Sequence, residues 1–413
     1  MDAHEWSLQF DVTDSLHQYQ NVVPVRALDS PLLLNAICTA SSRFLTIVWG
    51  NTKRAGPIQY NGITLPDLDA ESALHYHNVC ISYLMQAETN IAHNTDILIA
   101  ITLLRYYEQV DAHAIGVDMQ NYLHVVKVFF ETRLKGEPAG LVGLLTMGLK
   151  DVHESATACF NSRSLSQSAC LMALRQEVWS ALIYGRPFEI PLSTVHDCII
   201  FDWTSKDQFY WVSRVFVWLA CILRLSYGTY QDEDDMADAP TKASSVSQRW
   251  RILKSFLDRW DQNPPSCFRP LWHEARDVSR GRIFPYMLMA TSCQVHTLQN
   301  IELGRIMLTV YDPIRKRLGQ GAASRERETA DLVRESTWRV CGLGLSNSSQ
   351  VSMVTACLAI ALCSDFIDGR EEQVAILDLL TKTERDHAWP VEQTIGQLRK
   401  TWHLGDAANI VSE

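Results

Sequence analysis

Three aspartates in one acidic tract have the spacing of a metal site. The tract runs from Gln231 to Asp238 and contains Asp234, Asp235 and Asp238. Carboxylates one helical turn apart point to the same side of a helix, and carboxylate oxygens are ligands that Mg²⁺ prefers. Such a site can bind and ionise an allylic diphosphate by neutralising its charge. The alternative interpretation is a solvated acidic loop, which the four consecutive acidic residues 232–235 favour.

Aromatic and cationic residues on both sides of the tract could complete an active site. Ring faces can stabilise a carbocation. The aromatic residues just upstream are Trp211, Phe216, Trp218, Tyr227 and Tyr230. The candidate diphosphate-binding residues are Arg249, Lys254 and Arg305. Arg305 has a second interpretation, as a helix residue whose stem lies along apolar neighbours while its charge reaches solvent.

The Asp-Asp-x-x-Asp pattern is typical of class I terpene cyclases, so one hypothesis is a magnesium-dependent enzyme acting on an allylic diphosphate. Such enzymes carry a second magnesium-binding element of Asn, Ser or Thr, and Glu at intervals of four. The nearest counterpart is Asn78, Ser82 and Gln86, which has glutamine in place of the carboxylate and precedes the first motif. We interpret it as a helix face and not as a ligand set.

Other polar residues fit no familiar catalytic pattern. His75 and His77 are two positions apart and leave a helix on different sides, and His273-Glu274 lacks the second histidine of a zinc-protease helix. A further group of polar residues lies inside apolar helical patterns, where charges persist only when paired. We predict that these residues cross-link neighbouring helices: Arg105, Glu108, Asp111, Arg175, Gln176 and Glu177.

Composition and charge limit the classes of partner. The 413 residues are 47% hydrophobic, which is enough for a large core, and the formal net charge is −10. Because the largest basic cluster is Arg315-Lys316-Arg317, we expect no direct binding of nucleic acid by this chain. The eleven cysteines form no Cys-x-x-Cys pair, so we expect reduced core cysteines.

The sequence also indicates where in the cell the protein is located. The longest apolar runs, Val215–Leu223 and Val351–Leu362, are shorter than the ~20 residues that span a bilayer. Residues 1–6 have neither the basic nor the apolar part of a secretory signal. We therefore expect a protein of the nucleus or cytoplasm that is not secreted and has no transmembrane segment.

Helical periodicity dominates the chain and predicts an all-α fold. We predict a single large irregular helical domain, either undivided or in two lobes that meet near the acidic tract. Residues 1–29 are expected to be a polar arm or short first helix, residues 30–403 the domain, and residues 404–413 a tail. Residues 50–66 are interpreted as loop. The expected helices are 31–48, 69–87, 97–107, 119–130, 141–150, 166–184, 206–227, 245–261, 290–310, 326–342, 351–366, 370–385 and 391–402.

An ordered set of short stretches resembles one family. The stretches are 30–38, 74–80, 103–111, 174–178 with Arg186-Pro187, Trp260 with 264–270, 341–347, 370–373 and 389–390. Together they are similar to the fungal-specific transcription factor domain, the helical middle region of zinc binuclear-cluster regulators. The likeness covers roughly residues 20–403. The six-cysteine DNA-binding module of that family has no counterpart in this sequence, so the resemblance implies a stand-alone copy of the regulatory domain.

Two functions are therefore expected from the sequence. The first is a transcription-regulator-like protein that regulates a fungal metabolic or biosynthetic gene set through protein partners, including a second copy, or through a small-molecule effector. It requires no cofactor. The alternative is a non-canonical sesquiterpene cyclase of secondary metabolism, a lyase with Mg²⁺ as cofactor and an isoprenoid diphosphate as substrate.

Overall fold

The computed structural model describes residues 9–51, 56–86, 94–115, 118–134, 162–192, 203–228, 242–315 and 318–404, and these residues are mostly helical, which confirms the all-α prediction. The first helices are α2 (Gln18–Asn21), α3 (Val23–Ala27), α4 (Pro31–Asn51), α5 (Ser72–Gln86), α6 (Thr95–Ile115), α7 (Asn121–Arg133) and α9 (Ser162–Tyr184). They are followed by α11 (Gln208–Tyr227), α12 (Lys242–Gln262), α13 (Ser292–Val310), α14 (Ala322–Asn347), α15 (Gln350–Cys363), α16 (Arg370–His387) and α17 (Glu392–Thr401). The expected helix 141–150 lies outside the described residues.

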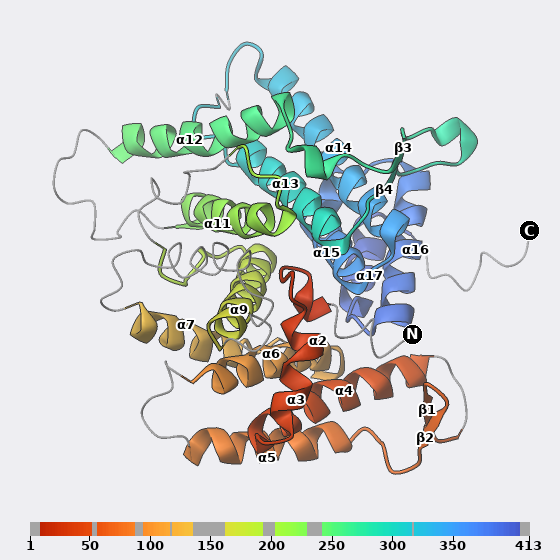
Figure 1. Ribbon diagram of the computed structural model, residues 1–413. Coiled ribbons are helices and arrows are strands. Elements are labelled where there is room, and N and C mark those ends of the chain that lie inside the picture. The colour runs from red at the N-terminus through yellow and green to blue at the C-terminus, as the bar shows by residue number, and fades with distance from the viewer. Residues whose placement is uncertain are drawn as a thin grey trace, which may run out of the picture.

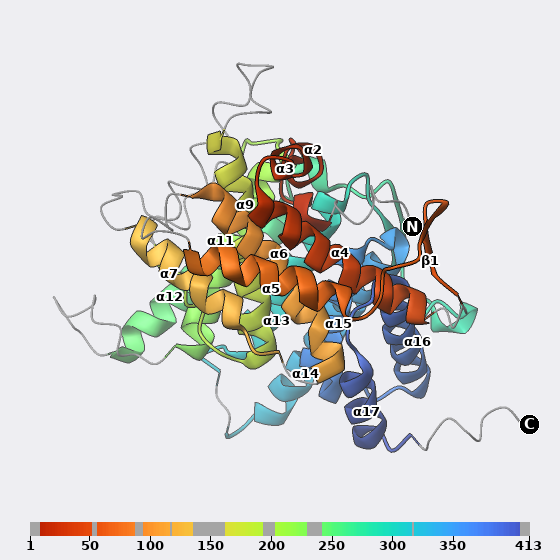
Figure 2. The ribbon, with the colours of Figure 1, turned by 90° about the horizontal axis from the view of Figure 1, so that it is seen from below.

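The helices pack mainly against neighbours in sequence, with a few long-range contacts that close the fold. Helix α4 packs on α5 and α6, and the two helices α4 and α5 run side by side in Figure 2. In the second half, α13 packs on α11 and α14, and α14 on α15 (Figure 1). Helix α16 returns to α4, where the Asn51 side chain donates to the backbone carbonyl of Glu384 at 3.0 Å.

Helix α11 shows why these residues form a core helix. Asp207 caps its N-terminus by accepting a hydrogen bond from the backbone N–H of Phe209 at 2.8 Å. The apolar run 215–223 follows, and every side chain from Trp211 to Leu223 except that of Arg214 is buried. A helix that is apolar on all sides is stable only when other helices surround it. One continuous cluster of buried side chains accordingly extends from Phe10 to Leu398.

The described part of the segment expected to be an arm or a short first helix contains α2 and α3 and contributes to this cluster. Phe10, Tyr19 and Val23 are buried. The backbone N–H groups of Tyr19 and Gln20 each donate to the Asp11 carboxylate at 2.8 Å, which folds the segment back on itself. Isolated apolar residues among polar ones were thus sufficient to bury the segment from Gln9 onward.

Two short hairpins were not predicted from the sequence. Strands β1 (Ile58–Tyr60) and β2 (Ile63–Leu65) pair antiparallel within the segment expected to be loop. Asn61 and Gly62, with φ of 50° and 77°, form their two-residue turn, and Asn-Gly is the preferred sequence for such a turn. Strands β3 (Trp272–Glu274) and β4 (Tyr286–Leu288) also pair antiparallel, with Trp272 opposite Leu288. Three-residue strands are too short to show alternation, which explains the omission.

Two helices, α4 and α11, are long and apolar enough to cross a membrane by length and composition alone. In α11, two thirds of the apolar window is buried inside the protein. Helix α4 lies close to the N-terminus and packs on α5 and α6. Core helices of water-soluble proteins meet the same criterion, so neither helix is a clear membrane span.

Candidate functional site

The predicted metal ligands Asp234, Asp235 and Asp238 lie outside the described residues, as does Tyr230. The described aromatic residues upstream of them pack in the core. The ring of Trp211 lies 5.6 Å from that of Trp260 in an edge-on arrangement. Trp218 packs at 4.8 Å from Phe256, and its indole N–H donates to a backbone carbonyl of α12 at 3.0 Å. These rings serve the packing of α11 on its neighbours.

The proposed diphosphate-binding cations lie on α12 and α13, and two of them already have carboxylate partners. The Arg305 guanidinium donates to both carboxylate oxygens of Asp261 at 2.6 and 2.7 Å and to Glu302 at 3.0 Å. Burial opposes its charge, but the two carboxylates outweigh burial and raise the pKa of Arg305. Lys254 pairs with Asp258 one turn along α12, and Arg249 lies half-buried on the same helix. Arg305 therefore ties α13 to α12.

A surface groove lies between the β3–β4 hairpin, α14 and α16. Its volume is about 710 Å³. The floor is apolar and includes Phe284, Pro285, Leu288, Leu345 and Leu379. The polar and aromatic lining includes Trp272, Glu274, Arg282, Tyr286, Ser346, Asp378 and Lys382. The size and the lining are those of a small-molecule site, in which apolar walls hold the ligand and a few polar groups orient it.

Side chains near the end of α14 fix one wall of the groove. The Asn347 amide donates to the carbonyl of Met287 at 2.9 Å and accepts from the N–H of Met289 at 3.0 Å. The Ser346 hydroxyl accepts from the N–H of Met287 at 3.0 Å. These bonds satisfy backbone groups of β4, much as another strand would. Gly342 allows the close approach, because a Cβ there would lie 2.1 Å from the Pro285 carbonyl oxygen.

Arg276 anchors the connection between the two strands. Its guanidinium donates to the carbonyl of Ile283 at 2.9 Å and pairs with Glu372 of α16. The same group lies 3.9 Å from the centre of the Trp338 ring of α14, an arrangement that favours a cation. Hairpin, α14 and α16 are therefore joined through one residue.

Some charged side chains of the groove form ion pairs and others do not. Arg282 pairs with Glu274, which also accepts from the Trp272 indole N–H at 3.0 Å. Lys382 makes no ion pair with any described residue, although Asp378 lies one turn earlier on α16. An ammonium group beside an apolar floor is suited to an amphipathic ligand with an anionic end. The described lining has no histidine or cysteine, and the described residues contain no group of three or more metal-ligating side chains.

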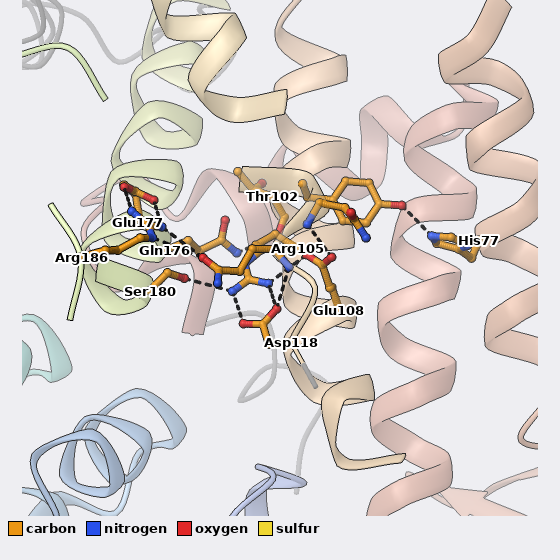
Figure 3. A network of polar contacts seen from close by, with 12 residues as sticks. His77, Thr102, Arg105, Glu108, Asp118, Gln176, Glu177, Ser180 and Arg186 are labelled. Atoms are coloured by element: carbon orange, nitrogen blue, oxygen red, sulfur yellow. Dashed lines mark hydrogen bonds and ion pairs between the residues drawn. The ribbon is translucent and has the colours of Figure 1, made fainter. Parts of the chain in front are cut away.

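Most of the polar residues predicted to cross-link helices do so, and Figure 3 shows Arg105, Glu108 and Gln176 among them. The Arg105 guanidinium of α6 donates to Glu108 at 2.9 Å, to Asp118 at 2.6 Å and to Ser180 of α9 at 3.0 Å. Arg186 donates to both oxygens of the Glu177 carboxylate at 2.6 and 2.8 Å. Glu108 also accepts from the N–H of Asn121 of α7 at 2.7 Å, Gln176 donates to the Thr102 carbonyl of α6 at 2.9 Å, and Asp111 pairs with Arg43 of α4. The prediction is confirmed for Arg105, Glu108, Asp111 and Gln176. It is wrong for Glu177, whose partner Arg186 follows its own helix α9, and Arg175 bonds a backbone carbonyl of the N-terminal segment. The partner Asp118 precedes α7 and carried no sequence signal.

Sequence inspection missed the groove residues themselves. No local pattern marks Lys382 or Asp378, since they are ordinary polar positions of an amphipathic helix. The residues that support the groove did carry a sequence signal. Ser346 and Asn347 belong to the stretch 341–347, and Glu372 belongs to the stretch 370–373. Both stretches contributed to the family resemblance. The structure brings these two stretches to the same hairpin.

By geometry the groove is a candidate binding site, and the β3–β4 hairpin forms one of its walls. What it binds must be argued from its own residues. No family model, curated protein or solved structure matches this chain.

Proposed function

We propose that the protein is a regulatory helical domain that responds to a small amphipathic molecule with an anionic end, bound in the groove between the β3–β4 hairpin, α14 and α16. The observation that carries the proposal is the groove itself, with its volume of about 710 Å³, its apolar lining, and Lys382 in that lining without an ion pair to any described residue. The family resemblance supports the regulatory part.

The arrangement suggests how binding could be transmitted. The groove walls belong to a hairpin and to two helices that are far apart in the sequence. A ligand that contacts all three stabilises the arrangement in which they are close, and so shifts the population of the protein towards it. The protein then presents a changed surface to its partners, including a second copy, in the nucleus or cytoplasm.

Ligand binding is tested with 8-anilinonaphthalene-1-sulfonate, an apolar fluorophore with one anionic group. The wild-type protein should bind it with saturation. Ala375→Trp should fill the groove and abolish binding, and Lys382→Gln should weaken it about 10-fold through loss of a charged contact. Val374→Trp is the matched control, because Val374 precedes Ala375 but faces solvent outside the groove. Equal affinity of Ala375→Trp and wild type would refute the groove as the site.

Regulation is tested by fusing the full chain to a foreign DNA-binding module. Transcription from a reporter bearing the matching DNA site should change with the wild-type fusion and revert towards the baseline with Ala375→Trp. Unchanged transcription with every fusion, together with no captured partner from nuclear extract, would remove the regulatory proposal.

The second candidate function is a magnesium-dependent sesquiterpene cyclase, favoured by the sequence motif Asp234, Asp235 and Asp238 alone. The test is incubation of the protein with farnesyl diphosphate and Mg²⁺, with gas chromatography of the products. A hydrocarbon made by the wild type and lost in the double variant Asp234→Ala, Asp235→Ala would establish the enzyme. Absence of product, also with geranyl and geranylgeranyl diphosphates, would exclude it.

A further inference from the structure

A small internal chamber lies where the segment before α2 meets α6, α9, α15 and the residues after α16. Its volume is about 20 Å³, which is room for a single water molecule or a monatomic ion. Four of its lining residues, Gln9, Arg175, Gln176 and Trp179, are at least nine-tenths buried. The chamber is separate from the groove and shares no residue with it.

Arg175 brings a positive charge to this chamber without a paired carboxylate. Its guanidinium donates to the backbone carbonyl of Gln9 at 2.6 Å and to the sulfur of Met172 at 2.9 Å, and it makes no ion pair with any described residue. Burial lowers the pKa of Arg175 to about 10. A buried charge without a counter-ion is costly, so an anion at this place would be stabilised.

The titratable groups around Arg175 do not supply that anion. Tyr19 acts on Arg175 but stays neutral, because burial raises the pKa of its hydroxyl. Asp11 also acts on Arg175, but this carboxyl group accepts from the N–H groups of Tyr19 and Gln20, and burial raises its pKa to about 7. His296 of α13 is also close enough to feel the charge, and burial and Arg175 hold its pKa well below its usual value, which keeps it neutral.

Two further donors at the chamber have no protein partner. The side-chain amide nitrogen of Gln9 and the indole nitrogen of Trp179 are buried and make no hydrogen bond. The side-chain oxygen of Gln176 is the corresponding acceptor without a partner. Donors outnumber acceptors at this small space, since two N–H groups and a guanidinium stand against the one Gln176 oxygen, and an excess of donors is complementary to an anion.

We propose that the chamber binds a monatomic inorganic anion of halide size, held by the Arg175 guanidinium, the Gln9 amide N–H and the Trp179 indole N–H. The ion joins the segment before α2 to α9, because Gln9 and Arg175 lie on the two sides. It therefore contributes to the attachment of the N-terminal segment to the core.

The first test compares melting temperatures in sodium chloride or bromide with those in sodium gluconate at the same ionic strength. Because the ion binds the folded protein, the wild type should show a saturable rise of about 2–4 °C in halide. The same melting temperature in halide and gluconate would overturn the proposal.

Trp179→Phe is the decisive variant, since it removes one donor but keeps a ring beside Trp389, whose centre lies 5.7 Å away. It should lose most of the halide-dependent rise. Trp250→Phe is the control, because its indole N–H donates to Leu308 away from the chamber, and it should keep the full rise. Arg175→Gln should abolish the rise if it folds. A full rise in Trp179→Phe would overturn the proposal, as would crystals in bromide without an anomalous peak beside Arg175.

Discussion

Arg105 and Arg175 are both buried, yet their surroundings act on the guanidinium in opposite directions. Burial disfavours the charge of Arg105, but Asp118 and Glu108 outweigh that effect and raise its pKa. Arg175 has no paired carboxylate, and burial lowers its pKa. The same residue type is thus a structural cross-link in one place and the basis of a proposed anion site in the other.

Removing the carboxylate of Asp118 should be strongly destabilising. Asp118→Asn leaves the Arg105 charge buried with one carboxylate fewer, and breaking a buried pair costs about 3–5 kcal/mol. Urea denaturation followed by circular dichroism would measure the loss. Asp368→Asn is the control, because Asp368 pairs with Arg334 at an exposed site and should cost less than about 1 kcal/mol. Equal costs for the two variants would contradict the cross-linking role.

His387 should make the fold sensitive to acid. Burial lowers the pKa of His387 to about 4 from its usual value near 6.5. Between these two values the unfolded chain binds more protons than the folded protein, so stability should fall as the pH is lowered from about 6.5 to 4. The full shift corresponds to about 3 kcal/mol.

The measurement is the free energy of unfolding at several pH values for the wild type and for His387→Gln. The variant should lose part of the decline below pH 6.5. Superimposable pH profiles would show that His387 is not the group responsible.

At the scale of elements, the close packing of the β3–β4 hairpin on α14 depends on Gly342, which has no side chain. Gly342→Ala places a methyl group against the Pro285 carbonyl, where the available distance is 2.1 Å, and the hairpin must shift away from α14. We expect a loss of about 1–3 kcal/mol in stability and weaker binding of the anionic fluorophore. The control is Gly396→Ala on α17, where a Cβ meets no atom within 4 Å. Full fluorophore affinity in Gly342→Ala would contradict the role of the hairpin as a groove wall.

The sequence predicted many of the helices well because their apolar residues recur at helical spacing or form a continuous run, and some of them begin with a capping residue. Thr291, for example, accepts from the N–H of Gln294 at 3.3 Å at the start of α13 and completes a capping box there. The groove could not be predicted in this way. Its wall is a hairpin whose strands are separated by eleven residues, and its shape depends on long-range contacts of Asn347 with the Met287 carbonyl and of Arg276 with Glu372.

At the scale of the whole molecule, the N-terminal segment is part of the single core. Removal of residues 1–29, the expected arm, would strip Phe10, Tyr19, Val23 and Ala27 from the buried cluster. The Tyr19 hydroxyl would also be lost as the partner of the Thr102 hydroxyl, 2.7 Å away. We expect the truncated chain to lose cooperative unfolding, as measured by calorimetry. A sharp transition at the wild-type temperature would restore the description of this segment as an arm.

The contact between α4 and α16 has a consequence for synthesis in the cell. Asn51 and its partner Glu384 are 333 residues apart, and ribosomes add about 5–20 residues per second. Helix α4 therefore emerges about 17–67 s before the helix that covers its end. During that interval the part of α4 that α16 covers is open to other nascent chains, although α5 and α6 already pack on the rest of the helix. Production of this protein should consequently depend on chaperones that hold the first half until translation ends.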